Sequence, residues 1–140
     1  MPRRIDLDRL KEALLSVKGL TYAVLFGSAR DGLLPKLDSD VDIAVALDHP
    51  ADLDERASLI GMIQDVLGTD QVDLVLVQPG ENWMLHREII KGRLLVCADP
   101  EAFAAFFSLA DRRGRDEEAR IARAWKLRHE LAKSLNSDDR

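Results

Sequence analysis

Three aspartates and a glycine-serine pair are the residues in this chain whose types and spacing could do chemistry. Asp40 and Asp42 are separated by Val41 within a β-prone segment. Alternate residues of a strand face the same side, so the two carboxylates would project together, about 7 Å apart. Such charges repel unless a cation joins them, and Mg²⁺ prefers oxygen ligands. The pair predicts a divalent-metal site, and the alternative is an exposed strand face with two solvated aspartates.

A third carboxylate, Asp73, lies in the segment from Gln71 to Val77, where its neighbours from 72 onward are aliphatic. This composition predicts a central strand that is covered on both faces. A buried, unpaired aspartate is costly, so Asp73 needs a metal or another cation there. If this strand lies beside the one that carries Asp40 and Asp42, the three carboxylates converge as in a two-metal phosphoryl-transfer site.

The glycine-serine pair, Gly27-Ser28, ends the apolar segment 21–26 that precedes the aspartates. Gly27 lets the backbone approach a ligand, Ser28 offers a hydroxyl, and the N–H groups of a following helical turn attract anions. Gly-Ser pairs are also common turn residues, so this pair alone is a weak signal. With the acidic residues that follow, it predicts a phosphate cradle beside a metal site.

The rest of the chain supplies the elements that must position these residues. Apolar periodicity predicts helices near 6–18, 53–67 and 82–91, and another that opens at Asp99-Pro100 and packs Phe103, Phe106 and Phe107 on the sheet. A last helix over 115–135 is expected to bury Ile121, Ala124, Leu127, Leu131 and Leu135. Strands are expected at 21–26, 41–47, 71–77 and 93–97.

Helices interleaved with four strands indicate an α/β (α+β) domain with a mixed four-stranded sheet covered by helices. A length of 140 residues fits a single compact domain. We expect residues 1–110 to form that domain and residues 111–140 to form a C-terminal helix packed on it.

Composition narrows the function classes. The net charge of −5 argues against nonspecific binding of nucleic acid. Residues 111–140 hold 9 Lys or Arg against 7 acidic residues, a mild asymmetry that favours a solvated helix face over a docking tail. The chain has no apolar stretch long enough for a membrane span, so no membrane partner is expected. Its lone cysteine, Cys97, sits in an apolar run and behaves as a small hydrophobe. A cytoplasmic protein is the natural interpretation.

The Gly-Ser turn, the Asp-x-Asp pair and the later aspartate together resemble the nucleotidyltransferase signature of the DNA polymerase β superfamily. More narrowly, the chain is similar to the minimal nucleotidyltransferases that act as MntA-type antitoxins paired with HEPN-domain toxins. The similarity covers most of residues 8–98. It includes the stretch from Glu88 to Val96, which resembles the closing helix and strand of that family.

The resemblance implies a role for each of these residues. Gly27 and Ser28 would hold the triphosphate of ATP. Asp40 and Asp42 would bind two Mg²⁺ ions, and Asp73 would bind the catalytic ion and help to deprotonate the acceptor hydroxyl. The implied reaction is transfer of AMP to a tyrosine of a cognate HEPN ribonuclease toxin.

Two departures from the family pattern lie in the loop before the acidic pair. Eleven residues separate Ser28 from Asp40 where the family usually has ten, and one extra loop residue costs little. Arg30 lies one position before the family's usual arginine position, which holds Asp31 here. Arg30 therefore either binds the triphosphate or pairs on the surface with Asp31 or Asp38.

Other functions remain open at this stage. The chain could neutralise a partner by contact without catalysis, or it could transfer a nucleotide to a small molecule or an RNA end. No long second domain is present to form a small-molecule pocket, which favours a macromolecular acceptor. Nucleotide preference is not encoded in any recognisable residue, and a homo-oligomer is compatible with the sequence.

Overall fold

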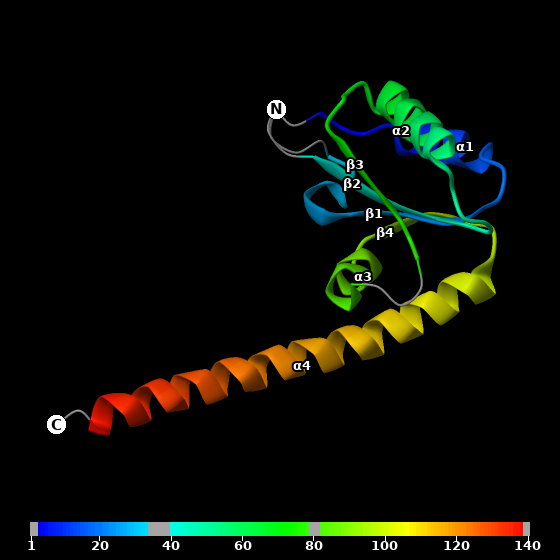
Figure 1. Cartoon of the computed structure of the whole chain (residues 1–140). Coiled ribbons are helices and arrows are strands. Elements are labelled where there is room, and N and C mark those ends of the chain that lie inside the picture. The colour runs from blue at the N-terminus through cyan, green and yellow to red at the C-terminus, as the bar shows by residue number, and fades with distance from the viewer. Residues whose placement is uncertain (1–2, 34–39, 79–81, 139–140) are drawn as a thin grey trace.

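The computed structural model describes residues 3–33, 40–78 and 82–138 of the chain. Along the sequence, helices and strands alternate around one sheet (Figure 1). The elements are α1 (Leu7–Leu15), β1 (Leu20–Phe26), the 3₁₀ turn η1 (Gly27–Ala29), β2 (Val41–Leu47), α2 (Leu53–Leu67), β3 (Val72–Leu76), α3 (Trp83–Ile90), β4 (Arg93–Cys97) and α4 (Pro100–Asp138).

The four strands form one mixed sheet in the order β3-β2-β1-β4. β1 pairs antiparallel with β2 and with β4, whereas β2 and β3 are parallel. Parallel neighbours need a crossover connection, and α2 provides it. The predicted fold class, an α+β domain with a four-stranded mixed sheet and C-terminal helical structure, is confirmed.

The position of β3 corrects one expectation. We expected a central strand from the aliphatic residues around Asp73, but β3 is an edge strand whose one neighbour in the sheet is β2. Only Leu74 of this strand is fully buried, and Asp73 is exposed. Asp73 is therefore not a buried carboxylate that needs a cation, contrary to expectation.

Each face of the sheet has its own hydrophobic core. On one face, α1 and α2 pack with a cluster that includes Leu10, Leu14 and Ile63. On the other face, α3 and α4 pack with a cluster around Phe26 and Ile89 (Figure 1). Helices on both faces bury alternate residues of β1 and β2, which explains why these two strands are the most apolar in the chain.

The predicted helix ends follow local sequence signals. The carboxylate of Asp52 accepts a hydrogen bond from the N–H of Glu55 at 2.8 Å and caps the start of α2. Gly68 ends the same helix in the left-handed conformation, with φ of 69°. α2 therefore has the bounds that the sequence predicts.

The C-terminal part of the chain differs from the prediction. One continuous helix, α4, replaces the two helices that we expected, and it runs without a break through residue 110. Phe103 and Phe106 pack on the sheet cluster as predicted, whereas Phe107 is 43% exposed. No helix among the described residues is both long and apolar enough to cross a membrane.

The expectation of a buried stripe on the last helix was wrong for the isolated chain. Its five residues, Ile121, Ala124, Leu127, Leu131 and Leu135, are all exposed, because α4 continues past the sheet and past α3 (Figure 1). The division of the chain into residues 1–110 and 111–140 remains a prediction.

Candidate functional site

Strand register brings the predicted site residues to one end of the sheet. Phe26, the last residue of β1, pairs with Asp42 of β2, and Asp42 pairs with Asp73 of β3. Gly27 follows Phe26 directly and starts η1. Three adjacent strands therefore place the glycine turn and two carboxylates side by side.

The three aspartates belong to the same face of the sheet. Asp42 is paired with Phe26, which lies in the core on the α3 and α4 side, and directly paired residues share a face. Asp73 is paired with Asp42, and Asp40 precedes Asp42 by two positions at the entry to β2. The same-face placement that the Asp-x-Asp spacing predicts is thus consistent with the register.

The electrostatics of Asp42 reflect this grouping. Partial burial raises the pKa of the Asp42 carboxyl above its ordinary value of 3.8, and the charges of Asp73 and then Asp40 raise it further. Within the described residues, no ion pair or hydrogen bond compensates any of these three carboxylates. As far as the described residues show, the end of the sheet therefore carries negative charge that a cation would stabilise.

Gly27 fits against Asp42 so closely that another residue could not replace it unchanged. Its φ is 72°, in the left-handed region that favours glycine. A Cβ atom added at Gly27 would lie 2.3 Å from Oδ2 of Asp42. The missing side chain thus leaves a space directly beside the carboxylate, where a ligand could approach the backbone.

Ser28 and Arg30 lie on the turn that follows Gly27. Both are exposed, whereas Ala29 between them is buried and anchors the turn. The N–H of Arg30 donates to the carbonyl of Gly27 at 3.3 Å, closing a single 3₁₀ turn. A turn this short has no macrodipole, so any phosphate contact here would come from individual N–H and hydroxyl groups.

Two roles are expected of Arg30, namely binding of the triphosphate and surface pairing with an aspartate. Asp38, one of its two expected surface partners, lies outside the described residues, as do all of residues 34–39. Arg30 makes no ion pair with another residue in the described part of the chain, Asp31 included. Its exposed guanidinium is therefore available to an incoming anion.

Another cation reaches this end of the sheet, and the sequence contains no signal for it. Arg93, the first residue of β4, pairs with Leu25 of β1 and is exposed. Leu25 belongs to the core on the α1 and α2 side. Because directly paired residues share a face, Arg93 belongs to the sheet face opposite the carboxylates. The register thus places it near the glycine turn but not among the acidic residues.

The carboxylate oxygens of Asp40, Asp42 and Asp73 are suitable ligands for a divalent cation, but they do not complete its coordination by themselves. Among the residues that the structure describes, no three His, Cys, Asp or Glu side chains are arranged to hold a metal ion by themselves. Mg²⁺ is commonly bound by one or two carboxylates together with substrate phosphates and water. The carboxylates beside Gly27 fit that mode, in which the nucleotide completes the coordination.

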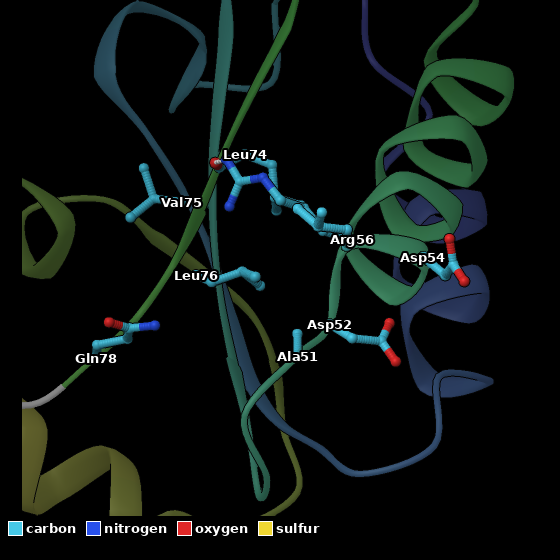
Figure 2. A pocket seen from close by; sticks show the side chains of 9 residues that line it. Ala51, Asp52, Asp54, Arg56, Leu74, Val75, Leu76 and Gln78 are labelled. Atoms are coloured by element: carbon cyan, nitrogen blue, oxygen red, sulfur yellow. Dashed lines mark hydrogen bonds between the residues drawn. The ribbon is translucent and has the colours of Figure 1, made fainter.

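An open groove lies elsewhere, between the start of α2 and the edge strand β3 (Figure 2). Ala51 to Asp54 line one side, and Leu74, Leu76 and Gln78 line the other. Asp52 and Asp54 make it acidic, and Arg56 already donates to the carbonyl of Leu74 at 3.1 Å. The groove includes none of the predicted site residues and is poorly suited to a triphosphate.

Comparisons with known proteins bear on this arrangement. A family model described as "Polymerase beta, Nucleotidyltransferase" matches residues 8–101. No curated protein matches the chain. Among solved structures, a mutant MntA toxin-antitoxin complex matches with a TM-score of 0.70 and 20% identity, over 86% of this chain and 96% of that chain.

Two further structural matches are also toxin-antitoxin complexes. A tri-AMPylated Shewanella oneidensis HEPN toxin in complex with MNT antitoxin matches with a TM-score of 0.63 and 19% identity, over 86% of this chain and 92% of the other. A toxin-antitoxin with AMP-PNP matches with a TM-score of 0.67 and 20% identity, over 86% and 96%. At such identities the likeness establishes the fold. The family model covers more than half of the chain, so the chain belongs to the polymerase beta nucleotidyltransferase family.

Proposed function

We propose that the chain is a Mg²⁺-dependent protein adenylyltransferase that transfers AMP from ATP to a hydroxyl of a partner protein. The observation that carries this proposal is the register that groups Asp42 and Asp73 beside Gly27, with Asp40 two positions away. Negative charge that no described residue neutralises, next to a backbone that a ligand can approach, suits a metal-nucleotide complex.

Each residue has a defined task in the proposed reaction. The backbone at Gly27 and the hydroxyl of Ser28 bind the triphosphate, and Arg30 contributes positive charge to it. Asp40 and Asp42 are the residues that would hold Mg²⁺. Asp73, on the exposed edge strand, would bind the catalytic ion and help to accept the proton of the incoming hydroxyl.

The reaction is an in-line displacement at the α-phosphate. The acceptor oxygen forms a new bond to the α-phosphorus, the bond to the bridging oxygen breaks, and pyrophosphate leaves. When bound, Mg²⁺ supplies charge neutralisation for the phosphates and lowers the pKa of the attacking hydroxyl. The protein's part is to align the two reactants, which accounts for much of the rate enhancement in such reactions.

The acceptor that we propose is a tyrosine of a cognate HEPN ribonuclease toxin, so that AMPylation silences the toxin in the cytoplasm. One structural neighbour is in complex with a tri-AMPylated HEPN toxin, and another holds AMP-PNP, which supports this acceptor and ATP as the donor. The lining of the groove in Figure 2 does not include Asp42, and a macromolecular acceptor can supply the missing wall of the site.

Neutralisation by contact alone is the second candidate function. The exposed apolar side chains of α4, such as Trp125 and Leu131, favour it because they offer a protein-binding surface that needs no catalysis. The two candidates differ in whether the acidic residues are required for neutralisation.

Transfer of labelled AMP to the product of the adjacent gene, which we expect to be a HEPN-domain protein, tests the proposal. We expect Asp40→Asn with Asp42→Asn to reduce transfer at least about 100-fold, because the charge that binds Mg²⁺ is removed. Asp54→Asn with Asp65→Asn is the matched control, since both residues are exposed and lie on α2, which packs on the sheet face opposite the three carboxylates. Equal transfer by the two double variants would refute the proposal, and neutralisation without transfer would favour contact.

A further inference from the structure

The outer half of α4, defined here as residues 119–136, extends away from the domain (Figure 1). The last ion pair that ties α4 to the domain joins Glu118 to Arg87 of α3. Every residue of the outer half is exposed. From Glu118 to the end of α4 at Asp138, a rise of 1.5 Å per residue gives a free length of about 30 Å.

The outer half carries large apolar side chains in solvent. Ile121, Trp125, Leu127, Leu131 and Leu135 are between 40% and 67% exposed. At 100° per residue they lie within an arc of about 160° on the helix surface. A contiguous apolar stripe of this size on an otherwise charged helix is typical of a protein-binding surface.

The stripe continues the face by which α4 packs on its own domain. Phe103, Phe106 and Ala110 point toward the sheet and α3, and helix geometry places them within the same arc as Ile121. Gly114 keeps this face close to α3, because a Cβ there would lie 2.8 Å from the side chain of Arg87. The packed inner half therefore sets the direction of the outer half.

The charges beside the stripe indicate the kind of occupant. The outer half holds five cations and one acidic residue, namely Arg120, Arg123, Lys126, Arg128, Lys133 and Glu130. Pairing of this helix with the same helix of a second copy would bring like charges together. An apolar surface with an acidic rim, on a different protein, is the complementary partner.

The direction of α4 relates the stripe to the site. α4 packs on the sheet face to which Asp40, Asp42 and Asp73 belong, and it extends beyond the sheet on the side where β1 leads into η1 (Figure 1). A protein held along the outer half would thus lie in front of the carboxylates. A docked acceptor would gain reactivity from proximity rather than from a pocket.

We propose that the outer half of α4 is the docking arm for the protein that accepts AMP, binding it through the apolar stripe and its basic rim. This inference rests on the proposed function for the identity of the occupant. It assigns recognition of the acceptor to α4 and the transfer reaction to the end of the sheet, so the two can be separated by mutation.

The test compares two double variants that add the same charge. Leu127→Glu with Leu131→Glu alters the stripe, whereas Ala119→Glu with Ala122→Glu adds two carboxylates roughly 150° away on the same helix. The probe is the product of the adjacent gene, which we expect to be a HEPN-domain protein. Binding is measured by calorimetry, AMP transfer by intact-protein mass at a low acceptor concentration, and nucleotide binding with Mg²⁺ and AMP-PNP.

We expect the stripe variant to bind the HEPN-domain protein at least about 100-fold more weakly and to lose transfer in proportion, while its affinity for AMP-PNP is unchanged. The control variant should stay close to the wild type in all three measurements. Circular dichroism checks that both variants keep the helix.

Several results would overturn the inference. They are absence of binding by the wild type, binding of the stripe variant within about threefold of the wild type, or a wild-type dimer that the stripe variant converts to a monomer. The last result would make a second copy the occupant. If the wild type binds the HEPN-domain protein through the stripe but transfers no AMP, the proposed function fails and the docking arm stands.

Discussion

Replacement of Gly27 by alanine tests how the glycine turn and the carboxylates depend on each other. Gly27 has a φ of 72°, and a Cβ there would lie 2.3 Å from Oδ2 of Asp42. The substitution therefore perturbs the backbone and the carboxylate at once. It adds no charge and removes no hydrogen-bonding group, so any loss of activity comes from geometry.

The expected magnitudes follow from these two values. An alanine in the left-handed region costs about 1–2 kcal/mol. For a domain of this size, that lowers the melting temperature by about 3–7 °C. Carbon and oxygen atoms separate to about 3.4 Å, so the Asp42 carboxylate must move by roughly 1 Å. A displacement of this size at a catalytic group can reduce the rate about 100-fold.

Thermal unfolding and AMP transfer are the two assays, and Gly61→Ala is the matched control. Gly61 lies inside α2, and a Cβ there meets no atom within 4 Å. We expect Gly61→Ala to stabilise the protein by about 0.5–1 kcal/mol and to leave transfer unchanged. Transfer by Gly27→Ala at the wild-type rate, in a protein that remains folded, would refute the close coupling of Gly27 to the site.

Three further predictions concern charge and packing. The folded-state pKa of Asp42 is raised, so the stability of the wild type relative to Asp42→Asn should fall as the pH rises from below 3.8 through the raised value. The melting temperatures of both proteins, measured without Mg²⁺ over this pH range, check this. A difference in melting temperature that does not depend on pH would contradict it. Gly92→Ala should destabilise the fold by about 2–4 kcal/mol in urea unfolding, since its Cβ would lie 2.5 Å from the carbonyl oxygen of Leu25. A loss of stability under about 1 kcal/mol would show that the backbone shifts to accommodate the methyl group, and would contradict the prediction. Hydrogen bonds to Asp48 and Glu55 raise the pKa of His49, so the stability that its ion pairs add should be present below pH 6.5 and lost as the pH rises through the raised value. NMR titration of the His49 ring checks this. An unshifted pKa would contradict it.

Local patterns predicted most helices and strands because each carries its own signal. α2 has the predicted bounds, 53–67, and the glycine turn ends β1 as expected. The same-face placement of Asp40 and Asp42 also follows from spacing alone, since side chains alternate along a strand.

Strand order and exposure were beyond the reach of local patterns. Aliphatic residues around Asp73 suit an edge strand with a helix on one face as well as a central strand, and only pairing with distant residues decides between them. Asp73 therefore lies beside Asp42 as hypothesised. The pairing of β2 with β3 explains this position, whereas the predicted burial of Asp73 was wrong. The stripe that includes Leu131 was wrongly assigned to the core, because an amphipathic pattern does not say which protein covers it.

A crystal structure grown with Mg²⁺ and AMP-PNP would test the central claim most directly. The account predicts the triphosphate at Gly27 and Ser28, with metal ions bound to the carboxylates of Asp40 and Asp42 and close to Asp73. Nucleotide bound instead in the groove between Ala51 and Gln78, or at the glycine turn without any metal at the aspartates, would contradict it.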